Sequence, residues 1–134
     1  MSNLTKFFTE GLKNTILLRN NSGFSHKGSW IQANPNTVLD RWYLGDFCSA
    51  EYTISSEYDS RNRELVKCLI TAGIDNADLQ VFSRSATKQD LIGIEAIVNN
   101  SFVEVYVFPK KDILKDTKVI FTAQYFESQN PLVS

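Results

Sequence analysis

The sequence contains few of the residues that catalysis, metal binding and disulfide frameworks require. Its 134 residues include one histidine, two cysteines, three prolines and six glycines. A histidine-dependent active site would have to form around His26, and a lone histidine in a polar segment is more often simply solvated. Two cysteines and one histidine do not complete a four-ligand zinc site without a carboxylate. We therefore expect a protein that is not an enzyme and that holds no metal or cofactor.

Excess charge and long hydrophobic runs are also absent. The 14 basic and 15 acidic residues give a net charge of −1, whereas a nucleic-acid binder needs a basic face that displaces counterions. No apolar run approaches the roughly 20 residues of a membrane-spanning helix, and the N-terminus lacks the basic start and apolar run of a signal peptide. We expect neither nucleic acid nor a membrane as a partner.

Cys48 and Cys68 are too few for the disulfide framework of a small secreted protein. We expect two reduced, largely buried thiols that pack as small hydrophobic groups. The carboxylates of the central region, from Asp40 to Asp59, match no calcium-loop pattern. We expect them on the solvent-facing sides of strands.

Aromatic residues, in contrast, are abundant. They form 12% of the chain and include nine Phe and five Tyr. They are densest between Thr37 and Ile54, where two alternating segments are separated by Gly45-Asp46. Alternation with period two, in aromatic and β-branched residues, is typical of half-buried strands.

Similar patterns recur along the chain and predict about eight strands. Residues 61–69 also allow a helix, but the β-branched end of residues 63–72 favours a strand. Residues 20–36 are expected to form a long polar loop and residues 56–61 a polar turn. Asn99-Asn100 fits a tight hairpin connection, because Asn tolerates positive φ. The predicted strands are 15–19, two segments within 37–54, 63–72, 78–85, 91–99, 102–108 and 117–126.

Short strands at this spacing predict an all-β fold, an antiparallel β-sandwich of about eight strands in a single domain, 1–134. Residues 1–13 form a short N-terminal helix or arm, residues 14–126 the β-sandwich and residues 127–134 a C-terminal tail. The helix would either cover an end of its own sandwich or dock on a neighbouring subunit.

The candidate functional residues are aromatic, because aromatics serve both cores and subunit interfaces. Trp30 would be either a lid on the core or a contact for a partner. Asp40 and Arg41 fall on opposite faces of a strand, so each would pair across strands. The predicted interface residues are Phe7, Phe8, Phe24, Trp30, Trp42, Tyr43, Tyr125 and Phe126.

Three segments together resemble a known class of protein. They are Gly28-Ser29-Trp30-Ile31, the stretch from Val38 through Phe47 with Ala50 to Ile54, and Val119 to Phe126 with Gln129-Asn130-Pro131. The combination is similar to small virion structural proteins of tailed phages, especially T4-like phages of marine cyanobacteria. The resemblance begins after about Asn14, and its motifs are structural. It implies a non-enzymatic assembly component located in the virion, assembled in the host cytoplasm and packed against other virion proteins and copies of itself.

The position in the particle stays open at this point. A tail, baseplate or neck component is the first hypothesis, and a capsid-surface decoration protein is an alternative. A second class of function is a carbohydrate-binding module for host attachment, with Trp30, Trp42 and Tyr43 as its stacking face. A third is an enzyme centred on His26.

Overall fold

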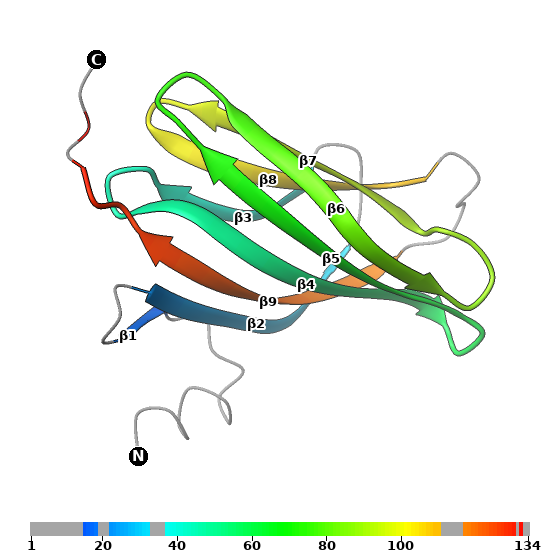
Figure 1. The fold of residues 1–134 in the computed structure, drawn as a ribbon. Coiled ribbons are helices and arrows are strands. Elements are labelled where there is room, and N and C mark those ends of the chain that lie inside the picture. The colour runs from blue at the N-terminus through cyan, green and yellow to red at the C-terminus, as the bar shows by residue number, and fades with distance from the viewer. Residues whose placement is uncertain (1–14, 19–21, 33–36, 111–116, 131, 133–134) are drawn as a thin grey trace.

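The computed structural model describes residues 15–18, 22–32, 37–110, 117–130 and 132, with the backbone alone for the first two ranges. These residues form nine strands and no helix (Figure 1). The helix or arm predicted for residues 1–13 lies outside them. The strands are β1 Thr15–Leu18, β2 Ser22–Gln32, β3 Thr37–Tyr43, β4 Phe47–Asp59, β5 Asn62–Ala72, β6 Ala77–Ala86, β7 Ile92–Asn99, β8 Phe102–Pro109 and β9 Lys118–Glu127.

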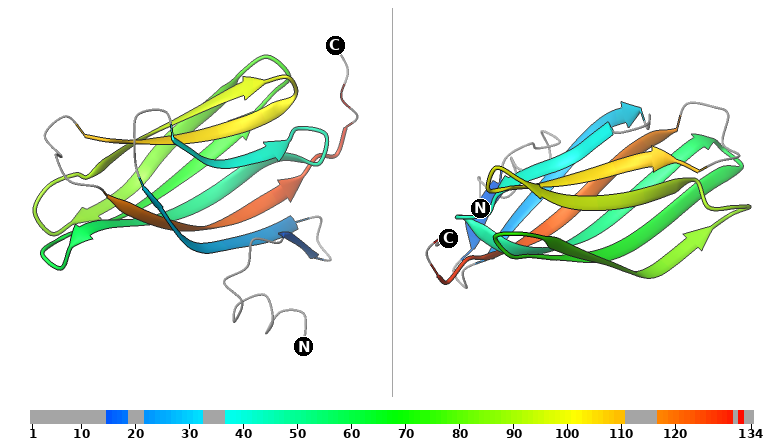
Figure 2. Two further views of the ribbon diagram at one scale, coloured as in Figure 1. Left: turned by 180° about the vertical axis from the view of Figure 1, so that it is seen from behind. Right: turned by 90° about the horizontal axis from the view of Figure 1, so that it is seen from above.

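The strands build two antiparallel sheets. The larger sheet has six strands in the order β1-β2-β9-β4-β5-β6, and the smaller has three in the order β3-β8-β7. Every pair of neighbouring strands in the two sheets is antiparallel. Figure 2 shows the smaller sheet stacked on one face of the larger. The predicted all-β antiparallel sandwich is therefore confirmed, as is the strand alternative for residues 63–72.

Two predicted loops are wrong. Most of the segment expected to be a polar loop, residues 20–36, is strand β2, which pairs with both β1 and β9 and has a register shift between Lys27 and Ile31. Two neighbouring strands satisfy its backbone hydrogen bonds, so its polar sequence did not prevent strand formation. The expected turn at residues 56–61 is shorter, because β4 continues to Asp59.

A tight two-residue turn connects β7 and β8, as predicted, but it lies at residues 100–101, one residue later than the predicted Asn99-Asn100. Asn99 pairs with Phe102, and the two loop residues, Asn100 and Ser101, have φ of 52° and 67°. Two consecutive positive φ values are those of a type I′ turn, whose twist matches that of the flanking strands. Pro109 ends β8, as its missing amide donor predicts.

The core lies between the two sheets and is filled by the inward-facing side chains of both. Strands β4, β5 and β9 bury alternate residues, as a sandwich with one wet face requires. The largest fully buried side chains include Tyr52, Phe121, Tyr125, Leu39 and Ile54. Both cysteines are free; Cys68 is buried and Cys48 is partly buried.

One buried carboxylate connects the two sheets. Asp40 was expected on a solvent-facing side, but it is only 4% exposed. The reason is a register shift in β3 between Val38 and Asp40, which lets the consecutive residues Leu39 and Asp40 both face the core. The hydroxyls of Tyr52 and Tyr125, on the larger sheet, donate to Asp40 Oδ2 over 2.8 Å and 2.5 Å.

Trp42 extends this network, because its indole Nε1 donates to the Tyr52 hydroxyl over 2.8 Å. The Trp42 ring also packs edge-on against Tyr125, with ring centroids 6.2 Å apart. The polar groups of Trp42, Tyr52 and Tyr125 are therefore satisfied inside the core, where an unsatisfied polar group would be costly.

A second buried carboxylate, that of Glu64, connects β5 and β6 of the larger sheet with the start of β7 in the smaller sheet. Glu64 of β5 has a fully buried side chain and forms an ion pair with Arg84 of β6. Its Oε1 accepts hydrogen bonds from the backbone amides of Leu91 and Ile92 over 3.0 Å and 3.2 Å. Ile92 begins β7 of the smaller sheet. The carboxylate of Glu64, on the larger sheet, therefore bonds directly to the smaller sheet.

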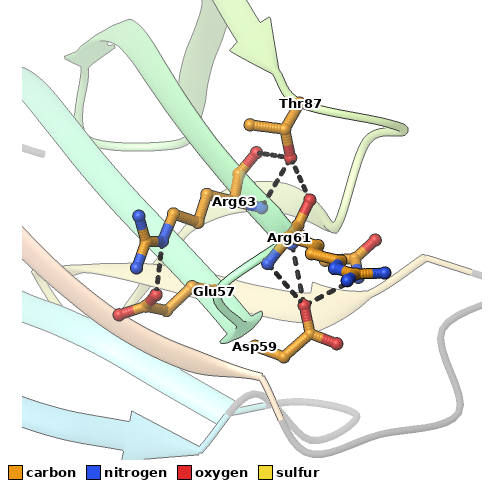
Figure 3. A network of polar contacts seen from close by, with 6 residues as sticks. Glu57, Asp59, Arg61, Arg63 and Thr87 are labelled. Carbon is orange, nitrogen blue, oxygen red and sulfur yellow. Dashed lines mark hydrogen bonds and ion pairs between the residues drawn. The ribbon is translucent and has the colours of Figure 1, made fainter.

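The tip of the β4–β5 hairpin is held by a polar network (Figure 3). Asp59 Oδ1 accepts from the amides of Arg61 and Asn62 over 2.8 Å and 2.9 Å. The hydroxyl of Thr87, after β6, donates to the Arg61 carbonyl over 2.7 Å and accepts from the Arg63 amide over 3.0 Å. The bonds to Asp59 form a local Asx-type turn, whereas those to Thr87 attach this turn to the segment after β6.

Removal of the Asp40 carboxylate tests the first connection between the sheets. We expect Asp40→Ala to lower the free energy of unfolding by about 3 kcal/mol or more, because two buried tyrosine hydroxyls lose their acceptor. Asp40→Asn keeps an acceptor oxygen and should cost less. Urea denaturation followed by tryptophan fluorescence measures both. A loss below about 1 kcal/mol for Asp40→Ala would contradict this role of the carboxylate.

Glu64 can be compared with an exposed carboxylate on the same sheet. Glu64→Ala is expected to lose about 3–5 kcal/mol of stability, because it breaks the buried ion pair with Arg84 and leaves two backbone amides without their acceptor. The control Glu57→Ala removes a partly exposed ion pair with Arg63 and should lose no more than about 1 kcal/mol. Equal losses for the two variants in urea denaturation would contradict a larger contribution of the buried carboxylate to the free energy of unfolding.

Burial of titratable groups predicts a loss of stability in alkali. Burial raises the pKa of the Cys68 thiol to about 12. Burial, and next the charge of Asp40, raises the pKa of the Tyr52 hydroxyl well above 10.0. The unfolded chain releases these protons at lower pH than the folded protein, so stability should fall as the pH rises from about 9 toward 12. Urea denaturation at several pH values should show a shallower fall for Cys68→Ala; identical slopes would exclude a contribution from Cys68.

Candidate functional site

The described residues contain no group of three or more His, Cys, Asp or Glu that could hold a metal ion. They do contain a pocket of ≈ 570 Å³ at one end of the sandwich. It lies where β3 turns into β4, beside the start of β8 and the end of β9. Its lining includes Arg41, Tyr43, Gly45, Asp46, Phe102 and Glu127.

The two exposed or half-exposed aromatic rings of the pocket are Tyr43 and Phe102. They pair across β3 and β8, with ring centroids 5.3 Å apart. The Tyr43 ring lies against the backbone of Gly45, where an added Cβ would come within 2.2 Å of it. Any larger residue at position 45 would displace this ring, so the glycine lets the aromatic wall lie on the turn.

Arg41 lies beside these rings. Its guanidinium is 3.8 Å from the centroid of the Phe102 ring, a cation–π contact. Its Nε donates to Glu104 over 3.2 Å, which confirms the prediction that Arg41 pairs across strands. Glu104 also accepts from the Tyr106 hydroxyl over 2.8 Å. The hydrogen bond from Tyr106, and then that from Arg41, lowers the pKa of Glu104.

Two carboxylates complete the pocket. Asp46 is exposed on the β3–β4 turn, and Glu127 is half-buried at the end of β9. Among the described residues, no hydrogen bond or ion pair involves either carboxylate group, although the Asp46 carbonyl accepts from the Ser128 amide over 2.9 Å. Both carboxylates are therefore available as acceptors for a ligand in the pocket.

A second surface is the outer face of the six-stranded sheet, formed by the outward residues of β9, β4 and β5. No described element covers this face (Figures 1 and 2). It exposes Leu65, Leu69 and Phe126 by 46%, 44% and 42%. Leu65 and Leu69 share the outward side of β5 with Arg63, Lys67 and Thr71. The neighbouring strand β4 presents Ser49, Thr53 and Ser55 on the same face.

The charges of this outer face are balanced by cross-strand pairs. Lys67 lies 4.0 Å from Glu51, and Arg63 lies 2.8 Å from Glu57. Each pair joins β4 to β5, and each is partly exposed. The face therefore carries neither a strong excess of one charge nor a continuous apolar patch.

The structure divides the predicted interface residues into groups. Tyr43 and Phe126 are exposed by 41% and 42%, as an interface requires, whereas Trp42 and Tyr125 are 5% and 2% exposed. Trp42 and Tyr125 face the core because each alternates with an outward-facing neighbour, although Trp42 also contributes to the lining of the pocket.

For the other predicted interface residues, the structure describes no side chain. Phe7 and Phe8 are outside the described residues, and for Phe24, Trp30 and His26 the structure gives the backbone of β2 alone. The burial of Trp42 also removes it from the sugar-stacking face expected with Trp30 and Tyr43.

Of the residues that line the pocket, only Trp42 and Tyr43 were predicted site residues. Phe102, Asp46 and Glu127 are among those that were not. Each lies next to a predicted turn or strand end. This position is the one feature of the sequence that could have indicated a site there. Their convergence depends on the pairing of β3 with β8 and of β4 with β9. Sequence alternation does not reveal which strands are neighbours.

Comparisons with known proteins add one distant likeness. No protein-family model matches the chain, and no curated protein matches it. Among solved structures, the fold is similar to part of the tailspike protein gp49 from Acinetobacter baumannii bacteriophage Fri1, a capsular polysaccharide depolymerase, with a TM-score of 0.47 and 8% sequence identity. The match covers 94% of this chain and 22% of that chain. Such a likeness is too distant to indicate a function.

Within the described residues, no helix is long and apolar enough to cross a membrane.

Proposed function

We propose that this chain is a non-enzymatic structural protein of a tailed-phage virion. It serves as a tail, baseplate or neck component and packs in several copies against neighbouring subunits. The resemblance of three sequence segments to small virion proteins motivates the proposal. The observation that supports it most directly is the outer face of the six-stranded sheet, which none of the described elements covers and which exposes Leu65, Leu69 and Phe126.

The composition of this face suits protein packing. Its apolar side chains are nearly half exposed, and covering them would contribute roughly 1 kcal/mol each. The serine and threonine hydroxyls between them can pair with either donors or acceptors of a partner. Apolar residues among hydroxyls and charges that are already paired, such as Lys67 with Glu51, are typical of interfaces that form between proteins stable on their own.

The charge arrangement favours a second copy of this chain as the partner. In a two-fold symmetric contact the same patch meets itself, so unbalanced charges would repel. Here Glu51 with Lys67, and Glu57 with Arg63, are already paired within one face. A second copy therefore meets no excess of like charge, and the net charge of −1 adds little repulsion at longer range.

Location in the particle is tested by immuno-electron microscopy. Antibody against the purified chain should label purified virions of the phage that encodes it, at the tail, baseplate or neck. Labelling spread over the capsid surface would replace this proposal by the decoration alternative. Absence of the chain from the proteome of purified virions would contradict a structural role.

Self-association through the outer face is tested with a charge substitution. Leu69→Glu is expected to leave the midpoint of thermal unfolding nearly unchanged, because Leu69 is 44% exposed. It should weaken self-association at least tenfold, because it buries an unpaired charge in the contact. Sedimentation velocity over a concentration series measures the change.

The matched control is Ile74→Glu, because Ile74 is similarly exposed, by 42%, but lies between β5 and β6 away from the face. It should associate like the original chain. A chain that stays monomeric at all concentrations, or equal behaviour of the two variants, would contradict self-association through this face.

A further inference from the structure

We infer that the pocket at the β3–β4 turn is a binding site for a neutral carbohydrate, with Tyr43 as its stacking surface and Asp46 and Glu127 as its acceptors. The inference goes beyond the proposed packing role and does not depend on it. The pocket is lined by the β3–β4 turn and by β8, whereas Leu65 and Leu69 of the outer face take no part in it.

The size and lining of the pocket fit a small organic ligand. Its ≈ 570 Å³ lies within the range of about 300–1,000 Å³ that is usual for such sites. It combines an aromatic wall, Tyr43 and Phe102, with a few polar groups that converge on it. This combination, rather than volume alone, distinguishes binding pockets from surface irregularities.

The charges of the pocket select a neutral ligand. The Arg41 guanidinium is paired with Glu104, but it still adds positive charge at the pocket and offsets part of the attraction that the carboxylates would have for a cation. Asp46 and Glu127 place two carboxylates there, and they disfavour an anion. A ligand without net charge that carries many hydroxyls meets both kinds of group, because a hydroxyl donates to a carboxylate and accepts from a guanidinium.

The aromatic rings decide where a sugar ring would lie. One face of Phe102 is occupied by the Arg41 guanidinium at 3.8 Å. Tyr43, at 41% exposed, offers its ring to solvent beside that contact. The apolar face of a pyranose can pack on such a ring while its hydroxyls point to the rim, as aromatic residues with one wet side allow.

Backbone hydrogen bonds hold the parts of the pocket in place. The Leu44 amide donates to the Ser101 carbonyl over 2.8 Å, which fixes the turn to the β7–β8 hairpin. The Asp46 amide donates to the Tyr43 carbonyl over 3.0 Å, and the Ser128 amide donates to the Asp46 carbonyl over 2.9 Å. The aromatic ring and the carboxylates are thus carried by segments that are already ordered, which lowers the entropy lost on binding.

The test uses the full chain on an array of neutral and acidic bacterial-surface oligosaccharides. Neutral glycans should be retained, and the best of them should then be titrated by NMR. Tyr43→Ala is expected to weaken binding by about tenfold or more, because it removes the stacking ring. Asp46→Asn and Glu127→Gln change little in size and should each weaken binding several-fold through the loss of a charge-assisted hydrogen bond.

The control is Phe82→Ala, because Phe82 is the most exposed large apolar side chain among those the structure describes, at 52%, and lies on β6 outside the pocket. It should bind like the original chain, and thermal unfolding of every variant shows whether it is folded. Retention of no neutral glycan, equal binding by Tyr43→Ala and Phe82→Ala, or binding of arginine-rich peptides in place of glycans would overturn the inference. None of these results bears on the presence of the chain in virions or on its self-association.

Discussion

The sandwich depends on the way two buried carboxylates tie its sheets together. Asp40 extends from the smaller sheet to the hydroxyls of Tyr52 and Tyr125 on the larger one. Glu64 extends from the larger sheet to the backbone amides at the start of β7. Hydrophobic contacts between the sheets are not directional, whereas hydrogen bonds are. The hydrogen bonds to Asp40 and Glu64 therefore fix the relative placement of the two sheets in addition to stabilising the fold. Each carboxylate is tolerated inside because its neighbours supply donors.

The same arrangement determines which surfaces are free to act. Because the smaller sheet covers only one face of the larger, the outer face of β9, β4 and β5 stays open among the described elements. Because the core network turns Trp42 inward, its neighbours Arg41 and Tyr43 face outward and form the wall of the pocket. A core contact and a surface site are therefore linked through the alternation of a single strand. The two proposed roles, packing and sugar binding, use different parts of this exposed surface.

Particular residues show how far sequence reasoning could go. Alternation placed the strands of residues 63–72, 78–85, 102–108 and 117–126 closely, because period two is a local property of the chain. It failed for β2, where a polar segment becomes a strand because β1 and β9 lie on either side of it. It also failed for Asp40, because a register shift reverses the alternation within β3 and cannot be read from residue types alone. Tyr43 was predicted as a surface aromatic, but its partners in the pocket were not.

The sequence by itself determined that the chain is an antiparallel all-β protein with little net charge, and which residues alternate between inside and outside along most strands. These properties follow from local stereochemistry and from the composition, so they need no knowledge of neighbours. The tertiary structure alone decided the order of strands in each sheet, the burial of Asp40 and Glu64, and the meeting of Tyr43, Phe102, Asp46 and Glu127 at one pocket. The physical reason is that these features arise from pairing between distant segments, and many pairings satisfy the same local pattern.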